Sequence, residues 1–126
     1  MENSVTTGVL FLFLLLIKHS VADLWLQGRF TNKYGDKKNL TDLKLWVHSL
    51  DHAVLTAAIT LLFAGLWWAI IIAVLDFVLH SVIDYVKRIY ILRNNITAKQ
   101  HLYWKIQSVD QALHYTCYFV YVLIIF

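Results

Sequence analysis

The chain contains four pairs of ionisable residues, each with a spacing of four, in stretches that are otherwise apolar. The pairs are His19 and Asp23, His48 and His52, His80 and Asp84, and Asp110 and His114. Because residues four apart lie on one face of an α-helix, each stretch presents a single polar stripe. Neutral imidazoles and carboxylates together form a donor set that suits Zn²⁺, Mn²⁺ and Fe²⁺. The pattern therefore predicts a metal site with these eight residues as its ligands.

Eight donors exceed the needs of one four-coordinate ion, so we expect one or two divalent ions, with zinc preferred and manganese or iron as alternatives. Two ions suit the hydrolysis of a phosphoester or amide by a bridging hydroxide. Asp23, Asp84 and Asp110 are the candidate catalytic carboxylates, because a carboxylate that the metal does not need can act as general base. Further polar residues of these stretches are candidates to orient ligands or substrate: Gln27, Asp51, Asp76, Gln107 and Gln111.

The stretches that carry the pairs are long enough to be transmembrane helices. Of 126 residues, 60% are hydrophobic and 15% are charged, against roughly 25% charged in a soluble domain. A helix needs about 20 apolar residues to cross the hydrocarbon core. We expect an all-α membrane protein, a single domain over residues 1–126 with cytoplasmic loops at 28–42 and 87–108. Its four transmembrane helices would form a bundle and cover residues 9–27, 43–64, 66–86 and 109–126.

The basic residues predict the orientation of this bundle. Ten of the eleven Lys and Arg residues lie in residues 29–44 or 87–105. Four helices place both segments on one side, which the positive-inside rule assigns to the cytoplasm. Both termini then lie on the non-cytoplasmic side, and we expect a bacterial inner membrane. At about 1.5 Å per residue, all four pairs fall at one depth, near the cytoplasmic face.

Charge inside the apolar stretches needs compensation. A carboxylate at the centre of a transmembrane helix costs at least about 2.5–3.5 kcal/mol. Protonation, hydrogen bonds to histidine and a bound cation each lower this cost, so interhelical hydrogen bonds remain the structural alternative to a metal site. Lys18, the one basic residue outside the two basic segments, is expected to pair with a buried aspartate.

Short sequence matches suggest an internal duplication. The segment HSVAD at residues 19–23 recurs as HSVID at 80–84, and SLDHA at 49–53 resembles SVDQA at 108–112. Two duplicated helical hairpins would bring their polar faces together at a shared interface, where membrane sites are often found. This interpretation agrees with a common site built from all four stretches.

The ordered motifs also resemble a known family. They read His-x-x-x-Asp-x-x-x-Gln, His-x-x-x-His, His-x-x-x-Asp-Tyr and Asp-Gln-x-x-His, and they resemble the bacterial and phage membrane family catalogued as domain of unknown function 3307. The resemblance covers nearly the whole chain, and its pattern is similar to that of proteins labelled membrane-bound metal-dependent hydrolases. Asp51 and Asp76 lie outside it. The matching residues are His19, Asp23, Gln27, His48, His52, His80, Asp84, Tyr85, Asp110, Gln111 and His114.

The leading functional hypothesis is a membrane-embedded metal-dependent hydrolase that acts on a lipid-linked or phosphorylated substrate near the cytoplasmic face. One alternative is a proton or metal-ion transporter or channel, because intramembrane Asp and His residues also form relays. Another is a non-enzymatic phage or bacterial accessory protein.

The expected partners are the lipid bilayer and, through residues 87–105, anionic lipid head groups. We expect no nucleic acid; a homo-oligomer is compatible with the sequence, as is a signal peptide cleaved after residues 20–22.

Overall fold

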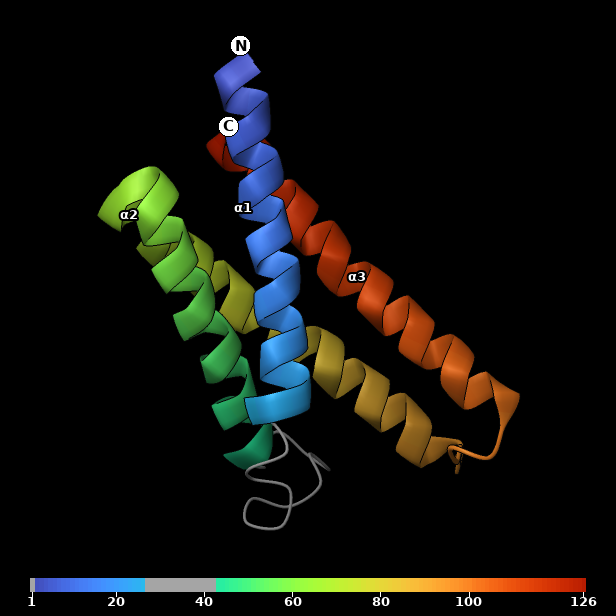
Figure 1. Ribbon diagram of the computed structural model, residues 1–126. Coiled ribbons are helices and arrows are strands. Elements are labelled where there is room, and N and C mark those ends of the chain that lie inside the picture. Colours follow the sequence, from blue (N-terminus) through green and yellow to red (C-terminus); the bar gives the residue numbers. More distant parts are fainter. Residues whose placement is uncertain (1, 27–42) are drawn as a thin grey trace.

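The computed structural model describes residues 2–26 and 43–126 (Figure 1). Helix α1 spans Glu2–Val21 and continues into a short π-helical turn, η1, at Ala22–Leu26. Helix α2 spans Leu43–Arg93, and α3 spans His101–Ile125. The described residues contain no strand, which confirms the all-α prediction.

Helix α2 consists of two helical arms that meet at Gly65. The backbone of Gly65 is non-helical, with φ 80° and ψ 179°, a conformation that residues with a Cβ rarely adopt. The chain doubles back there, as Figure 1 shows. We call residues 43–64 the first arm and residues 66–93 the second arm. The stacked rings of Trp46 and Phe77, 5.7 Å apart, join the two arms.

The helices extend further than the apolar stretches do. The second arm continues to Arg93 and α3 already begins at His101, so most of the loop expected at 87–108 is helical. The residue types of these segments explain why the helices continue. These segments contain neither proline nor glycine, so the basic residues mark the end of the apolar stretch and not the end of the helix. Helix α1 likewise begins before residue 9, while the loop expected at 28–42 lies outside the described residues.

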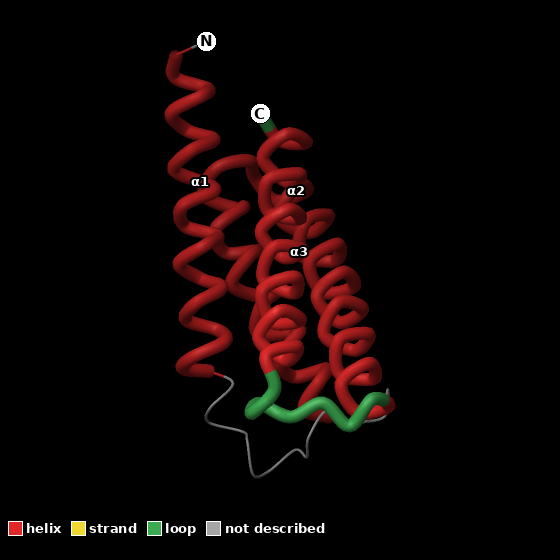
Figure 2. Tube along the Cα trace, turned by 90° about the vertical axis from the view of Figure 1, so that its right-hand side faces the viewer, coloured by secondary structure: helices red, strands yellow, loops and turns green. Residues whose placement is uncertain are grey.

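The two ends of the molecule differ in their packing. Both termini lie at one end, and the connection between α2 and α3 lies at the other (Figures 1 and 2). Near the termini the core is apolar and aromatic, built from Phe11, Leu15, Ile72, Tyr118 and Tyr121. Helices α1 and α3 approach closely here: a Cβ on Gly8 would lie 3.2 Å from Val122 Cγ1.

The interior is unusually polar and the exterior unusually apolar. In the part of the chain that the structure describes, more polar than apolar side chains are buried, while large hydrophobic side chains are exposed along all the helices. Two helical segments, Ser4–Leu26 and Leu43–Arg93, are long and apolar enough to cross a membrane. The polar groups that the helices bury form the candidate site.

A candidate metal centre of histidines and aspartates

The four polar stripes meet in the interior of the molecule. The five histidines of the stripes are almost completely buried, each with at most 4% of its surface exposed. Their rings pack against one another, with centroids 3.7 Å apart for His52 and His80 and 4.1 Å apart for His80 and His114. The histidines come from α1, from both arms of α2 and from α3: His19, His48, His52, His80 and His114.

Asp23 lies where three of these histidines converge. Its carboxylate is 3.1 Å from Nε2 of His19, 3.2 Å from Nε2 of His48 and 3.1 Å from Nε2 of His52. Asp23 belongs to η1, and π-helical turns often occur at functional sites because they redirect a side chain from the regular helical face. With a quarter of its side chain exposed, Asp23 also connects the buried cluster to the surface.

His48 and His80 face each other across the two arms of α2. Their Nε2 atoms are 3.3 Å apart, and Asp84 Oδ2 lies 3.6 Å from the first and 3.8 Å from the second. Two neutral imidazoles in this arrangement can form at most one hydrogen bond with each other. The Nδ1 atoms of both rings are buried without a hydrogen-bond partner among the described residues. Two imidazole nitrogens and a carboxylate oxygen thus converge at one point between the arms.

A second carboxylate lies on the α3 side of the cluster. His114 Nε2 is 3.7 Å from Asp84 Oδ1 and 3.6 Å from Asp110 Oδ1. The ammonium of Lys87 joins the two carboxylates, 3.2 Å from Asp84 Oδ1 and 2.8 Å from Asp110 Oδ2. The other oxygen, Asp110 Oδ1, is buried and accepts no hydrogen bond from the described residues. Apart from its 3.6 Å contact with His114, this oxygen can therefore accept a hydrogen bond from a ligand.

Hydrogen-bond directions assign the protons of two histidines. The ammonium of Lys18 can only donate, and it lies 3.3 Å from His52 Nδ1, so a neutral His52 carries its proton on Nε2 and donates it to Asp23. His19 Nε2 faces two acceptors, Asp23 Oδ2 and Gln111 Oε1, each at 3.1 Å. Its Nδ1 consequently accepts from the hydroxyl of Tyr118 at 2.8 Å.

Donor atoms of the cluster lie close enough to one another to hold a metal ion. In each of three groups, donor atoms lie within 4.8 Å of one another. Imidazole nitrogens and carboxylate oxygens at such separations can bind one ion between them. Among the described residues, Asp110 Oδ1 accepts no hydrogen bond, and a bound cation would compensate this buried carboxylate oxygen. The groups are Asp23 with His48, His52 and His80; His19 with His80 and His114; and Asp84 with Asp110 and His114.

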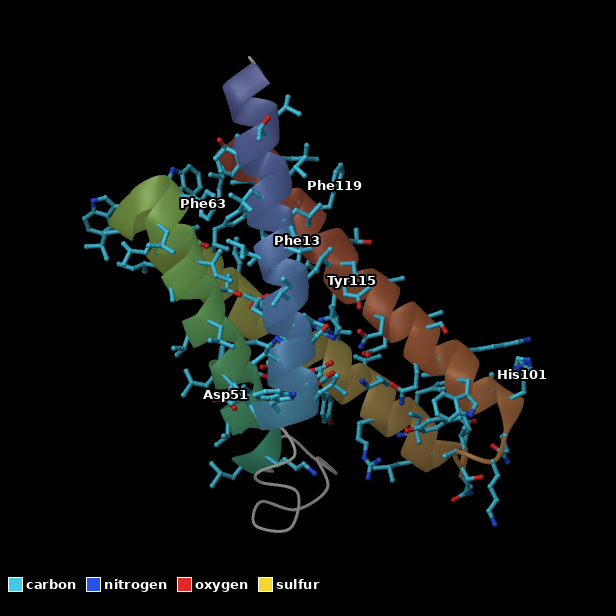
Figure 3. All side chains as sticks on the ribbon, in the orientation of Figure 1. Phe13, Asp51, Phe63, His101, Tyr115 and Phe119 are labelled. Atoms are coloured by element: carbon cyan, nitrogen blue, oxygen red, sulfur yellow. The ribbon has the colours of Figure 1, made fainter. Side chains whose placement is uncertain are left out.

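Asp76 belongs to a separate ion pair. As expected, Lys18 pairs with a buried aspartate: its Nζ is 2.8 Å from Asp76 Oδ2. The hydroxyls of Thr56 and Tyr121 also donate to this carboxylate, at 2.7 and 3.3 Å. Among the described residues, Lys18 connects Asp76 to the cluster, because its ammonium also lies 3.3 Å from His52 Nδ1. Asp51, on the first arm of α2 (Figure 3), forms none of the ion pairs found among the described residues of the cluster.

The three glutamines predicted to assist the site differ in their positions relative to the cluster. Gln111 contacts His19 and donates to Asp110 Oδ2 at 3.3 Å. Gln107 lines a pocket beside the cluster, whereas Gln27 lies outside the described residues. His101, the one histidine outside the apolar stretches, is exposed at the start of α3, next to the α2–α3 connection (Figure 3).

Two contacts of the cluster were not anticipated from the sequence. Lys87 was expected in a basic loop, but it lies in the second arm of α2, one turn after Asp84, and that i,i+3 spacing is the signal that could have identified it. Tyr118 extends the stripe of α3 by one turn beyond His114. Polar side chains at helical spacing along a stripe thus contact the cluster even where their type does not bind metal.

These features define a class: an all-helical protein whose helices bury a group of histidines and aspartates able to hold a metal ion. Residues 11–126 match the model of the family described as protein of unknown function (DUF3307), and the chain belongs to this family. The match agrees with the resemblance drawn from the four motifs. Searches of curated proteins and of solved structures found no match.

Proposed function

We propose that this protein is a membrane-embedded, metal-dependent hydrolase. The observation that carries the proposal is the convergence of five buried imidazoles, two buried carboxylates and the partly exposed carboxylate of Asp23 in one cluster. Burial of so many ionisable groups is costly, and a bound cation offsets that cost. The residues come from every helix, so the fold itself is organised around the cluster.

The membrane part of the proposal rests on the distribution of polarity. Exposed side chains of α1, both arms of α2 and α3 are largely apolar, as lipid contact requires. We propose that α1 with η1, the two arms and α3 form a bundle of four transmembrane segments. The basic residues near the α2–α3 connection then place the cluster close to the cytoplasmic face and both termini on the opposite side.

Four residues are the preferred ligands of the ion. His48, His80, Asp23 and Asp84 offer two imidazoles and two carboxylates, a common donor set for zinc. The charge balance supports one ion: with neutral imidazoles, the three carboxylates of the cluster and the ammonium of Lys87 leave a net charge of minus two. One divalent ion neutralises this charge. Zinc is our first choice, and manganese and iron remain alternatives.

The remaining residues of the cluster have supporting roles. His52 and His19, as Nε2–H donors, orient the Asp23 carboxylate. Lys87 fixes Asp84. Asp110 Oδ1, which accepts no hydrogen bond from the described residues, is our candidate general base, because a carboxylate oxygen can accept a proton from water. A divalent ion bound here would supply Lewis acidity, which activates both water and the bond to be hydrolysed.

One observation favours transport as a second candidate. From His52, a buried polar chain runs through Lys18 and Asp76 to Tyr121, towards the end of the molecule with the termini. Such chains can conduct protons. Beyond Tyr121, however, the aromatic contacts of Phe11 with Phe63 and Phe126, at 5.4 and 5.7 Å, fill the interior. Hydrolysis at the cluster therefore remains the preferred function.

Elemental analysis of the detergent-purified protein tests the metal centre. We expect about one zinc, manganese or iron per chain, and His48→Ala and His80→Ala should remove most of it because each deletes a ligand. His52→Gln should retain the metal, since its amide can still donate to Asp23. The matched control is His101→Ala, which deletes an exposed histidine outside the cluster. A wild-type protein that folds without any metal would end the proposal.

Hydrolysis is tested separately with a panel of phosphate esters and detection of released phosphate. Asp110→Asn should keep the metal but lower the rate by about 10²–10⁴-fold, because it removes the general base. Equal hydrolysis by wild type and Asp110→Asn would refute this role of Asp110. Proton or metal flux in proteoliposomes that requires Asp76, without hydrolysis, would instead support transport.

A further inference from the structure

A pocket beside the cluster has the charge expected of an anion-binding site. The pocket has a volume of about 480 Å³ and reaches the cluster at Asp23 and Asp84. Three cationic side chains, Lys44, Lys87 and Arg88, line it, so cations outnumber the carboxylates on its walls. Its outer wall includes Tyr103 and Trp104 of α3. An anionic group in this pocket would lie directly next to the proposed ligands.

Arg88 provides an independent indication of a ligand. Its Nε is buried and has no hydrogen-bond partner among the described residues. A buried donor without a partner is unfavourable, and an anion that accepts its hydrogen bond removes the penalty. A guanidinium is also suited to phosphate, because its planar fork can bind two oxygens at once. The chemistry of the pocket thus favours a phosphate or a similar oxyanion.

A second cavity adjoins the first and is apolar. It lies between the second arm of α2 and α3, has a volume of about 560 Å³, and has Val82, Val86, Ile106 and Val109 among its walls. Figure 1 shows these two helices running towards their connection at residues 94–100. A volume of this size accommodates one small ligand or one chain. The apolar groove alone would not discriminate between lipids, because any lipid tail could fill it.

Lys87 links the two cavities, because its side chain lines both. Its ammonium also lies 2.8 Å from Asp110, the candidate general base. An anionic head group paired with Lys87 could therefore extend into the polar pocket while its apolar chain lies in the groove. The combination selects an amphiphile over either a soluble phosphate or an uncharged lipid.

We propose that the ligand is a single-chain anionic amphiphile, an alkyl or isoprenyl phosphate, with its chain in the α2–α3 groove and its phosphate at Lys87 and Arg88. As a substrate assignment this rests on the proposed hydrolase function, whereas the binding itself requires only the two cavities. The phosphate would then lie beside Asp84 and Asp110, at the edge of the metal centre.

Native mass spectrometry of the full-length protein in dodecyl maltoside tests the proposal, with dodecyl phosphate as the probe. We expect about one probe molecule to be retained per chain, as for a single small-ligand site. Dodecylphosphocholine has the same chain with a zwitterionic head, and inorganic phosphate has no chain; both should be retained far less. Equal retention of dodecylphosphocholine would indicate ordinary lipid contact and overturn the proposal. Equal retention of inorganic phosphate would overturn the role of the groove.

Matched variants locate the binding site. Arg88→Met should lower retention about tenfold, the usual effect of losing a charged hydrogen bond, whereas Arg93→Met, at the exposed end of α2, should not. Val109→Trp should fill the groove and lower retention, whereas Val120→Trp, at an exposed valine of α3 outside the groove, should not. Unchanged retention in both Arg88→Met and Val109→Trp would refute the site.

Metal analysis of the same samples separates this inference from the proposed function. Specific retention of dodecyl phosphate by a protein that contains no metal would support the ligand class and refute the hydrolase. A protein that contains metal but does not prefer dodecyl phosphate would keep the metal centre and refute the ligand class. Treatment with EDTA before the measurement shows whether retention depends on the metal.

Discussion

At the scale of single residues, the pair formed by Lys18 and Asp76 is the clearest electrostatic feature outside the cluster. Both side chains are almost fully buried, with 3% of each exposed, and Nζ lies 2.8 Å from Oδ2. The carboxylate also accepts hydrogen bonds from Thr56 and Tyr121, so its charge is well compensated. Removal of one partner would leave a buried charge without compensation, which is far more costly than removal of both.

Lys18→Met should therefore lower the free energy of unfolding by about 3–5 kcal/mol, and the double variant Lys18→Met/Asp76→Leu should recover most of this loss. The free energies of unfolding of both variants are measured in detergent by titration with SDS, followed by circular dichroism. As a control, Lys99→Met at an exposed lysine should change stability by less than about 0.5 kcal/mol. If the double variant is no more stable than Lys18→Met, the charges of Lys18 and Asp76 do not compensate each other as proposed.

At the scale of elements, Gly65 determines whether α2 is one helix or two arms. Its φ of 80° and ψ of 179° belong to a region occupied almost only by glycine. A Cβ at Gly65 would meet no atom within 4 Å, so steric crowding by neighbours plays no part. The requirement for glycine comes from the backbone alone, and it places His48 of the first arm opposite His80 of the second.

Gly65→Ala should destabilise the protein by about 1–3 kcal/mol, because alanine must adopt a conformation that its Cβ disfavours. The measurement is the same SDS titration. Gly8→Ala is the matched control: Gly8 is helical, alanine favours a helix, and its Cβ would press only on the side chain of Val122, so the change should stay below about 1 kcal/mol. Gly65→Ala with wild-type stability would show that the turn does not need glycine.

At the scale of the whole molecule, the proposed orientation in the membrane can be compared with the positions of the chain ends. The termini lie at one end, and the connection at residues 94–100, flanked by basic residues, lies at the other (Figure 2). The proposed orientation puts that connection in the cytoplasm.

Cysteine labelling on intact bacterial cells tests this orientation. In a Cys117→Ser background, Ser4→Cys should react with a membrane-impermeant maleimide, whereas Ala98→Cys should react only after the cells are lysed. Both positions are exposed, so their reactivity depends on the side of the membrane. Labelling in the reverse pattern would invert the proposed topology, and labelling of both positions would argue against a membrane-spanning arrangement.

The sequence by itself determined which residues could form the site and on which helical faces they lie. Spacings of four in four apolar stretches are sufficient for this, because helical periodicity is a local property. The sequence also predicted that Lys18 would pair with a buried aspartate, since an isolated charge in an apolar stretch needs a partner. The ends of the helices were harder to predict, because charge signals where the apolar stretch ends and helix formation continues beyond it.

Only the tertiary structure decided which atoms meet. It brought His19, His48 and His52 to the carboxylate of Asp23, and it assigned Asp76 to Lys18 instead of the cluster. It also placed Lys87 between two carboxylates. The physical reason is that periodicity fixes a face but not the rotation or axial position of one helix against another; these depend on packing across the whole interior.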